Sequence, residues 1–182
     1  FLLAQQCPDG GFRLTYGSTA GCSSGDLSDT DATALAVEAL LVVERTVPVE
    51  AALVHATTWL RSQEDRVLGA WGGTGPTAAV NANSTGLVVQ ALLAAGRDDD
   101  SDETWITAQE LNDRNAGSTP ASGDLGAIAY DSGALTAALA DGIDDLARDQ
   151  WRRSTVQGVL AYGLPDFGSI GRAAVEPIRD PV

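Results

Sequence analysis

A short pattern that recurs three times constrains the fold of this chain more than any other feature. Each copy reads Asp or Asn, a small residue, Thr or Gly, Ala or Gly, and Leu, and then continues as an apolar run. The copies begin at Asp31, at Asn83, which is 52 residues later, and at Asp131, 48 residues after that. A capping residue before an apolar run predicts a helix, and the near-constant period predicts a helical repeat array.

The apolar runs and the segments between them predict two kinds of helix. The recurring runs are almost entirely Ala, Leu and Val, and a helix that is apolar on all sides is surrounded by protein. The intervening segments carry an apolar stripe and a charged face, which predicts outer helices that cover the inner ones. We expect inner helices at 29–44, 80–95 and 131–143, lying side by side, outer helices at 1–6, 48–64 and 102–112, and a last helix at 146–163.

The repeat also predicts the domain organisation. We expect an all-α domain over residues 1–168 and a tail or linker rich in Gly and Pro over 169–182. The chain contains no Met, and Phe1–Gln5 matches 59–63, the end of an outer helix that starts about ten residues earlier. We therefore expect the chain to be a piece of a longer protein, truncated within its first helix.

Composition excludes several classes of partner. The net charge is −14, and all 11 basic residues are Arg. Such an acidic chain lacks the basic patch that binds nucleic acid or an anionic membrane surface. No apolar run reaches the length of about 18 residues that a transmembrane helix needs.

The two cysteines, Cys7 and Cys22, lie close in sequence within one loop rich in Gly and Ser. Free thiols in a reducing compartment are one interpretation. We favour a disulfide, which would stabilise the fold by about 3 kcal/mol in the chain-entropy model. A disulfide predicts a location outside the cytosol, in the extracellular space or at the cell surface.

Two Gln and Gly-Gly-aromatic motifs resemble those of a known family. Gln63 precedes Trp71-Gly72-Gly73, and Gln5 and Gln6 precede Gly10-Gly11-Phe12. This arrangement resembles the repeat of the terpenoid cyclase and protein prenyltransferase group over residues 1–163, although the third copy lacks the Gly-Gly-aromatic turn. The resemblance implies an α/α toroid of outer and inner helices, here a partial ring of about three and a half pairs.

The same resemblance raises the possibility of catalysis. Class II terpene cyclases of the squalene–hopene type protonate their substrate with an Asp-x-Asp-Asp-Thr-Ala motif, and residues 29–34 match it except that Ala32 replaces the third aspartate. The match implies Asp31 as proton donor, with Asp29 beside it. Against this, Asn83 occupies the position of Asp31 in the second repeat, and an amide performs no acid chemistry. Helix capping at Asp31, Asn83 and Asp131 is the simpler interpretation.

Polar residues on the inner helices predict a binding face. Asp31 and Glu38 are seven residues apart and share one side of a helix, and Asn83 and Gln90 repeat this spacing. The third copy keeps only Asp131. Because polar groups among apolar helices must reach water or a partner, we predict that these five residues line a concave face and bind a ligand. A water-filled face without a ligand is the alternative.

Metal and cofactor sites are not predicted. The single histidine, His55, lies on an outer helix, whereas zinc requires further His or thiolate ligands. The acidic run 98–103 lacks the ligand spacing of a calcium loop and is interpreted as a solvated segment. Our leading hypothesis is a secreted or cell-surface, non-catalytic domain that binds a small molecule or a surface partner. A cyclase fragment and a purely structural module are the alternatives.

Overall fold

The computed structural model describes residues 1–16, 21–97 and 103–170 of the chain, and this part is mostly helical. The all-α prediction is confirmed, since the strands β1 and β2 contain only two residues each. The helices and strands are η1 (Leu2–Gln5), β1 (Phe12–Arg13), β2 (Ser28–Asp29), α1 (Thr30–Leu41), α2 (Val47–Ser62), η2 (Gly75–Thr77), α3 (Ala82–Ala94), α4 (Glu103–Gln109), α5 (Ser132–Asp141), α6 (Arg148–Gly158) and η3 (Val159–Tyr162).

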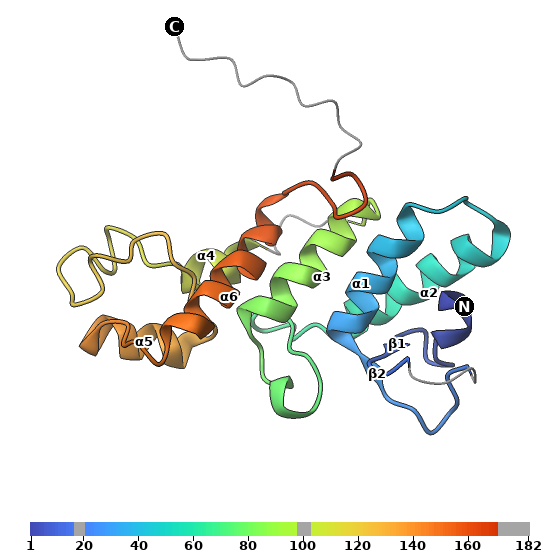
Figure 1. Ribbon diagram of the computed structural model, residues 1–182, viewed down its shortest axis with the longest axis horizontal. Coiled ribbons are helices and arrows are strands. Elements are labelled where there is room, and N and C mark those ends of the chain that lie inside the picture. The colour runs from blue at the N-terminus through green and yellow to red at the C-terminus, as the bar shows by residue number, and fades with distance from the viewer. Residues whose placement is uncertain (17–20, 98–102, 171–182) are drawn as a thin grey trace, which may run out of the picture.

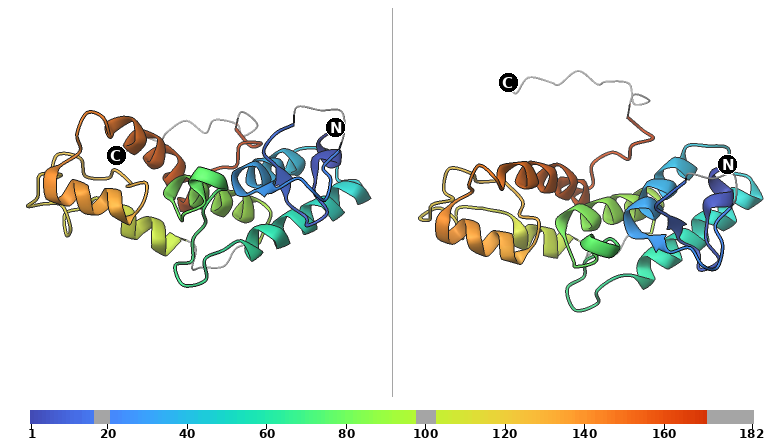
Figure 2. Two further views of the ribbon diagram at one scale, coloured as in Figure 1. Left: turned by 90° about the horizontal axis from the view of Figure 1, so that it is seen from below. Right: turned by 60° about the horizontal axis from the view of Figure 1, so that its bottom comes forward.

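The helices form two layers. α1, α3 and α6 lie side by side in one row, and α2 and α4 pack behind α1 and α3 (Figures 1 and 2). This arrangement follows from the sequence, because α1 and α3 are apolar on most sides and need neighbours around them. The main core lies between the two layers and includes Val37, Leu60, Trp71 and Leu92, all fully buried.

The third helix of the row is not the one that the repeat predicts. The predicted neighbours 29–44 and 80–95 are adjacent as α1 and α3, but α6 and η3 pack on α3 in place of the segment 131–143. That segment forms α5, which lies beyond α6 at one end of the molecule (Figure 1) and buries only Ala138. α6 approaches α3 very closely, because a Cβ atom on Gly86 would lie 1.9 Å from the carbonyl oxygen of Gln157.

A recurring hydroxyl contact accompanies this exchange. Thr33 of α1 accepts a hydrogen bond from the backbone N–H of Phe12 at 2.8 Å, and Thr85 of α3 accepts one from Trp71 at 3.0 Å. In the third repeat Ile128 takes the place of the aromatic residue, and its N–H is bound by Thr155 of α6 at 3.0 Å. The hydroxyl that completes the third repeat is therefore on α6, the helix that packs on α3.

The N-terminal loop is closed as predicted, since Cys7 and Cys22 form a disulfide. The bridge joins the end of η1 to the loop that leads into β2. The side chain of Gln6 links this N-terminal segment to α2, because its Nε2 donates a hydrogen bond to the carbonyl oxygen of Ala52 at 2.9 Å.

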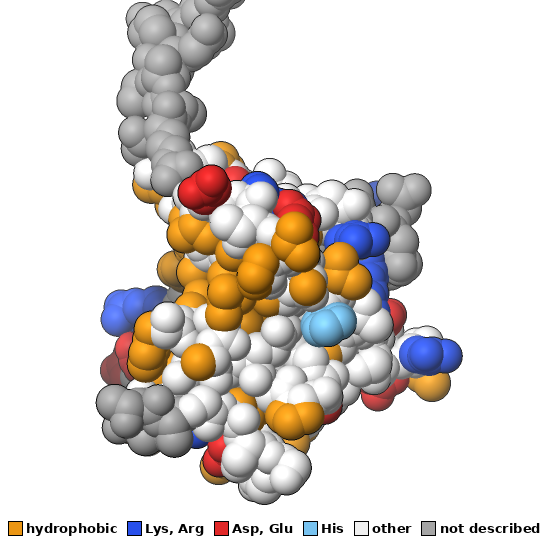
Figure 3. All heavy atoms as spheres, turned by 90° about the vertical axis from the view of Figure 1, so that its right-hand side faces the viewer, with side chains coloured by type: hydrophobic (Ala, Val, Ile, Leu, Met, Phe, Trp, Pro, Cys, Tyr) orange, Lys and Arg blue, Asp and Glu red, His pale blue; other side chains and the backbone are white. Residues whose placement is uncertain are grey.

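The free side of α1 and the adjoining part of α2 form one end of the helix row. Leu35 of α1, Val43 just beyond its end, and Val47 and Val54 of α2 are between 45% and 84% exposed. Figure 3 shows hydrophobic side chains gathered over this end of the molecule. Among the described residues, no helix combines the length and apolarity required to cross a membrane.

Candidate functional site

Four of the five predicted binding residues lie together on α1 and α3. The two helices are neighbours and run in the same direction (Figure 1), so equivalent positions of the repeat lie level with each other. Asp31 on α1 is level with Asn83 on α3, and Glu38 on α1 is level with Gln90 on α3. Each pair thus combines a carboxyl group on α1 with a carboxamide on α3, and the pairs are about 10 Å apart along the helices. We call this surface the α1–α3 polar face.

Helix capping is not the role of Asp31 and Asn83. The caps are two residues earlier: Asp29 Oδ1 accepts from the N–H of Ala32 at 2.8 Å, and Asn81 Oδ1 accepts from the N–H of Ser84 at 2.9 Å. The expectation that Asp31 and Asn83 cap their helices is therefore wrong. Both side chains lie inside the first turn of their helices and do not cap them.

Asp131 belongs to a different set. Its side chain caps α5 by accepting from the N–H of Ala134 at 2.8 Å, so it is the counterpart of Asp29 and Asn81. Because α5 does not take the place beside α3, Asp131 does not extend the polar face along the row. Asp29, the second catalytic candidate, is buried. Its Oδ2 already accepts a hydrogen bond from the hydroxyl of Thr74 at 2.6 Å.

The Glu38–Gln90 pair binds backbone atoms of the chain itself. Residues 163–170, which we call the crossing segment, follow η3 and pass over the C-terminal ends of α3 and α1. Gln90 Nε2 donates to the carbonyl oxygen of Pro165 at 2.9 Å, and the N–H of Phe167 donates to Glu38 Oε2 at 3.1 Å. The segment also packs tightly, because a Cβ atom on Gly168 would lie 1.7 Å from Val42 Cγ1.

Glu38 and Gln90 are both buried, and this changes the pKa of Glu38. Glu38 is 4% exposed and Gln90 is 1% exposed, and Glu38 Oε1 and Gln90 Oε1 are buried without a hydrogen-bond partner. Burial and, after it, the charge of Asp166 raise the pKa of Glu38 to about 7, although the hydrogen bond from the N–H of Phe167 acts in the opposite direction. The orientation of the Gln90 amide is fixed, because only its nitrogen can donate to a carbonyl oxygen.

The Asp31–Asn83 pair also combines a carboxyl group with a carboxamide, but its neighbours differ from those of the Glu38–Gln90 pair. Oδ1 of each side chain is buried and has no hydrogen-bond partner within the described part of the chain. Burial raises the pKa of Asp31, and the charge of Asp29 adds to this shift. The hydroxyl of Ser84 faces the carboxyl group and lowers its pKa in part, although it lies outside hydrogen-bonding geometry. Tyr130 lies near enough that the charge of Asp31 contributes to its raised pKa, after burial and Asp131.

The crossing segment is the element that sequence reasoning missed. The sequence places residues 164–168 at the end of the predicted domain, just before the predicted tail, and assigns them no role, but Pro165 and Phe167 are bound to the helix row. A buried carboxyl and a buried amide do signal that partners are needed. The partners are main-chain atoms, however, which any sequence supplies, so no residue pattern identifies the segment. Of the predicted tail, positions 171–182 lie outside the described residues.

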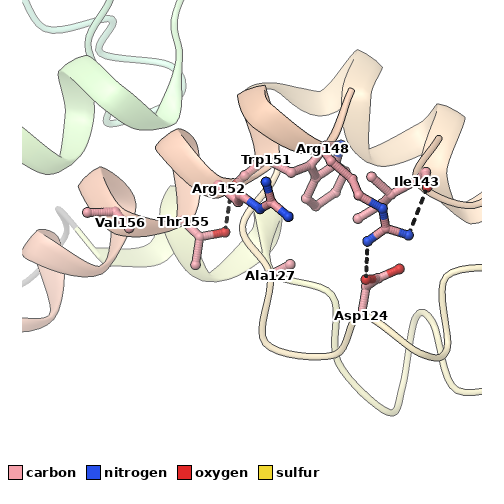
Figure 4. Close-up of a pocket in the computed structure, with 8 residues that line it drawn as sticks. All are labelled: Asp124, Ala127, Ile143, Arg148, Trp151, Arg152, Thr155 and Val156. Carbon is pink, nitrogen blue, oxygen red and sulfur yellow. Dashed lines mark hydrogen bonds and ion pairs between the residues drawn. The ribbon is translucent and has the colours of Figure 1, made fainter. Parts of the chain in front are cut away.

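Other hollows lie elsewhere on the surface. A cavity of about 350 Å³ is lined mainly by α6, and in Figure 4 Arg148 points from α6 toward Asp124, at 3.4 Å. A cavity of about 560 Å³ borders the crossing segment near Arg45, and one of about 260 Å³ lies between Asp9 and Trp59. None of these three cavities includes Asp31.

No group of three or more His, Cys, Asp or Glu side chains is placed to hold a metal ion among the residues that the structure describes. The acidic run 98–103, interpreted above as a solvated segment, lies outside the described residues except for its last position.

Comparison with known proteins adds no relative, since no protein-family model, curated protein or solved structure matches this chain. The resemblance to the terpenoid cyclase and prenyltransferase group therefore depends on the sequence motifs alone.

Proposed function

We propose that this chain is a non-catalytic binding domain, a partial α/α toroid that binds a ligand or partner on the α1–α3 polar face. The observation that carries the proposal is the Asp31–Asn83 pair, in which Oδ1 of each side chain is buried without a hydrogen-bond partner. The equivalent pair, Glu38 and Gln90, already holds backbone atoms of the crossing segment. Buried polar atoms without partners destabilise a fold by about 1–3 kcal/mol each, so a pair that retains two of them is suited to a ligand that satisfies them.

The chemistry of these atoms restricts the ligand. Both unpartnered atoms are carboxyl or amide oxygens, which accept hydrogen bonds. A ligand that satisfies them donates hydrogen bonds through N–H or O–H groups, and the NH₂ group of Asn83 can donate to an acceptor on the same ligand. The disulfide is typical of proteins outside the cytosol, and this supports a secreted or cell-surface location for the domain.

Ligand-observed NMR with the full chain tests this proposal. Three donor-rich probes cover the relevant classes: a mixed-sequence decapeptide pool, a linear maltohexaose and spermidine. We expect saturation transfer to at least one probe, and a loss of transfer in the double variant Asp31→Leu/Asn83→Leu. The variant Asp141→Leu, at the exposed end of α5, is the matched control and should retain the signal. Failure of all three probes to bind would refute the proposal.

One observation favours the alternative of a class II cyclase fragment. Burial raises the pKa of Asp31, and a carboxylic acid that stays protonated is what alkene protonation requires. The surroundings favour it less, because Phe12 and Trp71, the aromatic residues of the two turns, are fully buried in the core and offer no wall for a carbocation. Incubation of the chain with squalene and product analysis, with Asp31→Asn as control, tests this alternative.

A further inference from the structure

The Glu38–Gln90 pair shows what kind of ligand the α1–α3 polar face recognises. Its two contacts are with a backbone carbonyl oxygen at Pro165 and a backbone N–H at Phe167. Neither contact involves a side chain of the crossing segment. In an extended chain the C=O of one residue and the N–H of the second residue after it point to the same side. An amide donor and a carboxylate acceptor on adjacent helices therefore match one face of a polypeptide backbone.

The spacing of the helices supports this geometry. Packed helices have axes about 8–10 Å apart, and two to three residues of non-helical chain span about the same distance at about 3.3 Å per residue. The crossing segment uses this match: Pro165 lies over α3 and Phe167 over α1. It consequently runs across the helices rather than along them.

The Asp31–Asn83 pair repeats this arrangement without an occupant. It has the same carboxyl group on α1 and the same carboxamide on α3, one repeat of seven residues toward the helix N-termini. Asp31 Oδ1 and Asn83 Oδ1 are buried without a hydrogen-bond partner within the described part of the chain, as Glu38 Oε1 and Gln90 Oε1 are at the occupied pair. Neither residue caps its helix.

We propose that Asp31 and Asn83 bind the main chain of an extended segment of a partner polypeptide, as Glu38 and Gln90 bind Pro165–Phe167. The partner segment crosses α3 and α1 parallel to the crossing segment, about 10 Å from it. Asn83 donates to a carbonyl oxygen of the partner, and Asp31 accepts from an N–H two residues further on. This inference rests on the proposed function, because it names the class of ligand for the same face.

The charge around the pair adds a preference. Besides burial, the charge of Asp29 raises the pKa of Asp31, and the charges of Asp131 and Asp31 raise the pKa of Tyr130, so negative charge gathers at this end of the face. The net charge of the chain is −14. A partner segment that carries Lys or Arg beside the bound peptide groups is therefore favoured over an acidic one. The backbone contacts themselves do not depend on the partner's sequence.

Fluorescence anisotropy with the full chain tests the inference. The probe is a fluorescein-labelled decapeptide of alternating Ala and Ser with Lys at both ends, and the comparison probe is the same peptide with every second amide N-methylated. We expect binding of the first probe and affinity at least about tenfold weaker for the second, since N-methylation removes the N–H that Asp31 accepts.

Variants separate the contact from the fold. Asp31→Asn keeps an acceptor oxygen and should bind within about threefold of the original chain, whereas Asp31→Leu should bind about tenfold more weakly or worse. Asp141→Leu, on exposed α5, should leave the affinity unchanged. The N-methylated probe requires no variant, so the test stands even if Asp31→Leu fails to fold.

Each remaining outcome refutes the inference. Equal binding of the two probes, or no binding of the unmodified one, excludes main-chain recognition at this pair. If maltohexaose or spermidine then still binds in an Asp31-dependent way, the proposed binding function survives and only the polypeptide ligand is wrong. If no probe of any class binds, both fail.

Discussion

Glu38 couples the stability of the fold to pH, and the sign and size of this coupling follow from its environment. The pKa of Glu38 is about 7 in the folded chain, against an ordinary value of 4.5. The folded chain therefore holds this proton more tightly than the unfolded chain. The resulting stabilisation is fully present below about pH 4.5 and is lost as the pH rises to about 7.

The magnitude follows from the same shift. A difference of one pKa unit corresponds to about 1.4 kcal/mol, so Glu38 contributes at most about 3 kcal/mol between these pH limits. Glu38→Gln removes the titration and keeps an oxygen that accepts from the N–H of Phe167. We expect the free energy of unfolding of this variant to fall less than that of the original chain between about pH 5 and pH 8.

Urea unfolding at several pH values, with the disulfide intact, measures this difference directly. The matched control is Glu44→Gln, an exposed residue beyond the end of α1, which should follow the original chain at every pH. The reasoning is refuted if Glu38→Gln and the original chain lose stability in parallel across this range. Parallel curves would mean that Glu38 is solvated in the folded chain and that the crossing segment does not cover it.

Two further predictions concern the packing and the disulfide. Gly86→Ala should lower the free energy of unfolding by about 1–3 kcal/mol or more, because its Cβ would meet the backbone of Gln157, whereas Gly123→Ala, which faces open space, should change it little. Equal urea midpoints for the two variants would show that α6 does not lie against α3. Reduction of Cys7–Cys22 should lower the free energy of unfolding by about 3 kcal/mol, measured by urea titration with and without a reductant, and an unchanged midpoint would contradict this estimate.

The helices themselves were predictable because their signals are local. The inner helices expected at 29–44 and 80–95 are found as α1 (Thr30–Leu41) and α3 (Ala82–Ala94), and each starts after a side-chain cap. Pro48 marks the first turn of α2 correctly. Capping residues, Pro and helical apolar spacing each act within one or two turns, so a single sequence contains them.

The errors arose where the repeat was used to place elements in space. The period gives Asp131 the position of Asp31, but the caps show that Asp131 corresponds to Asp29. Each of the first two repeats has polar residues two positions apart, and the sequence does not say which of them is the cap. The neighbour of α3 was also wrong, because the hydroxyl that binds Ile128 comes from Thr155, a contact between distant segments.

The four-residue polar face was predictable for a physical reason as well. A carboxyl or amide group in an otherwise apolar helix is a non-local signal, because it requires a partner beyond that helix. Glu38 and Gln90 gave this signal in the sequence, and both are buried. The identity of the partner was not predictable, since the main chain of Pro165 and Phe167 carries no side-chain signature.

The exchange rate of the Phe167 amide proton tests the central claim most directly, because that claim is that side chains of the α1–α3 polar face bind backbone amides. In the original chain this N–H donates to Glu38 Oε2. We predict slow exchange of the Phe167 amide by NMR, retained in Glu38→Gln and lost in Glu38→Leu. Fast exchange in the original chain, or equal protection in Glu38→Leu, would contradict the account.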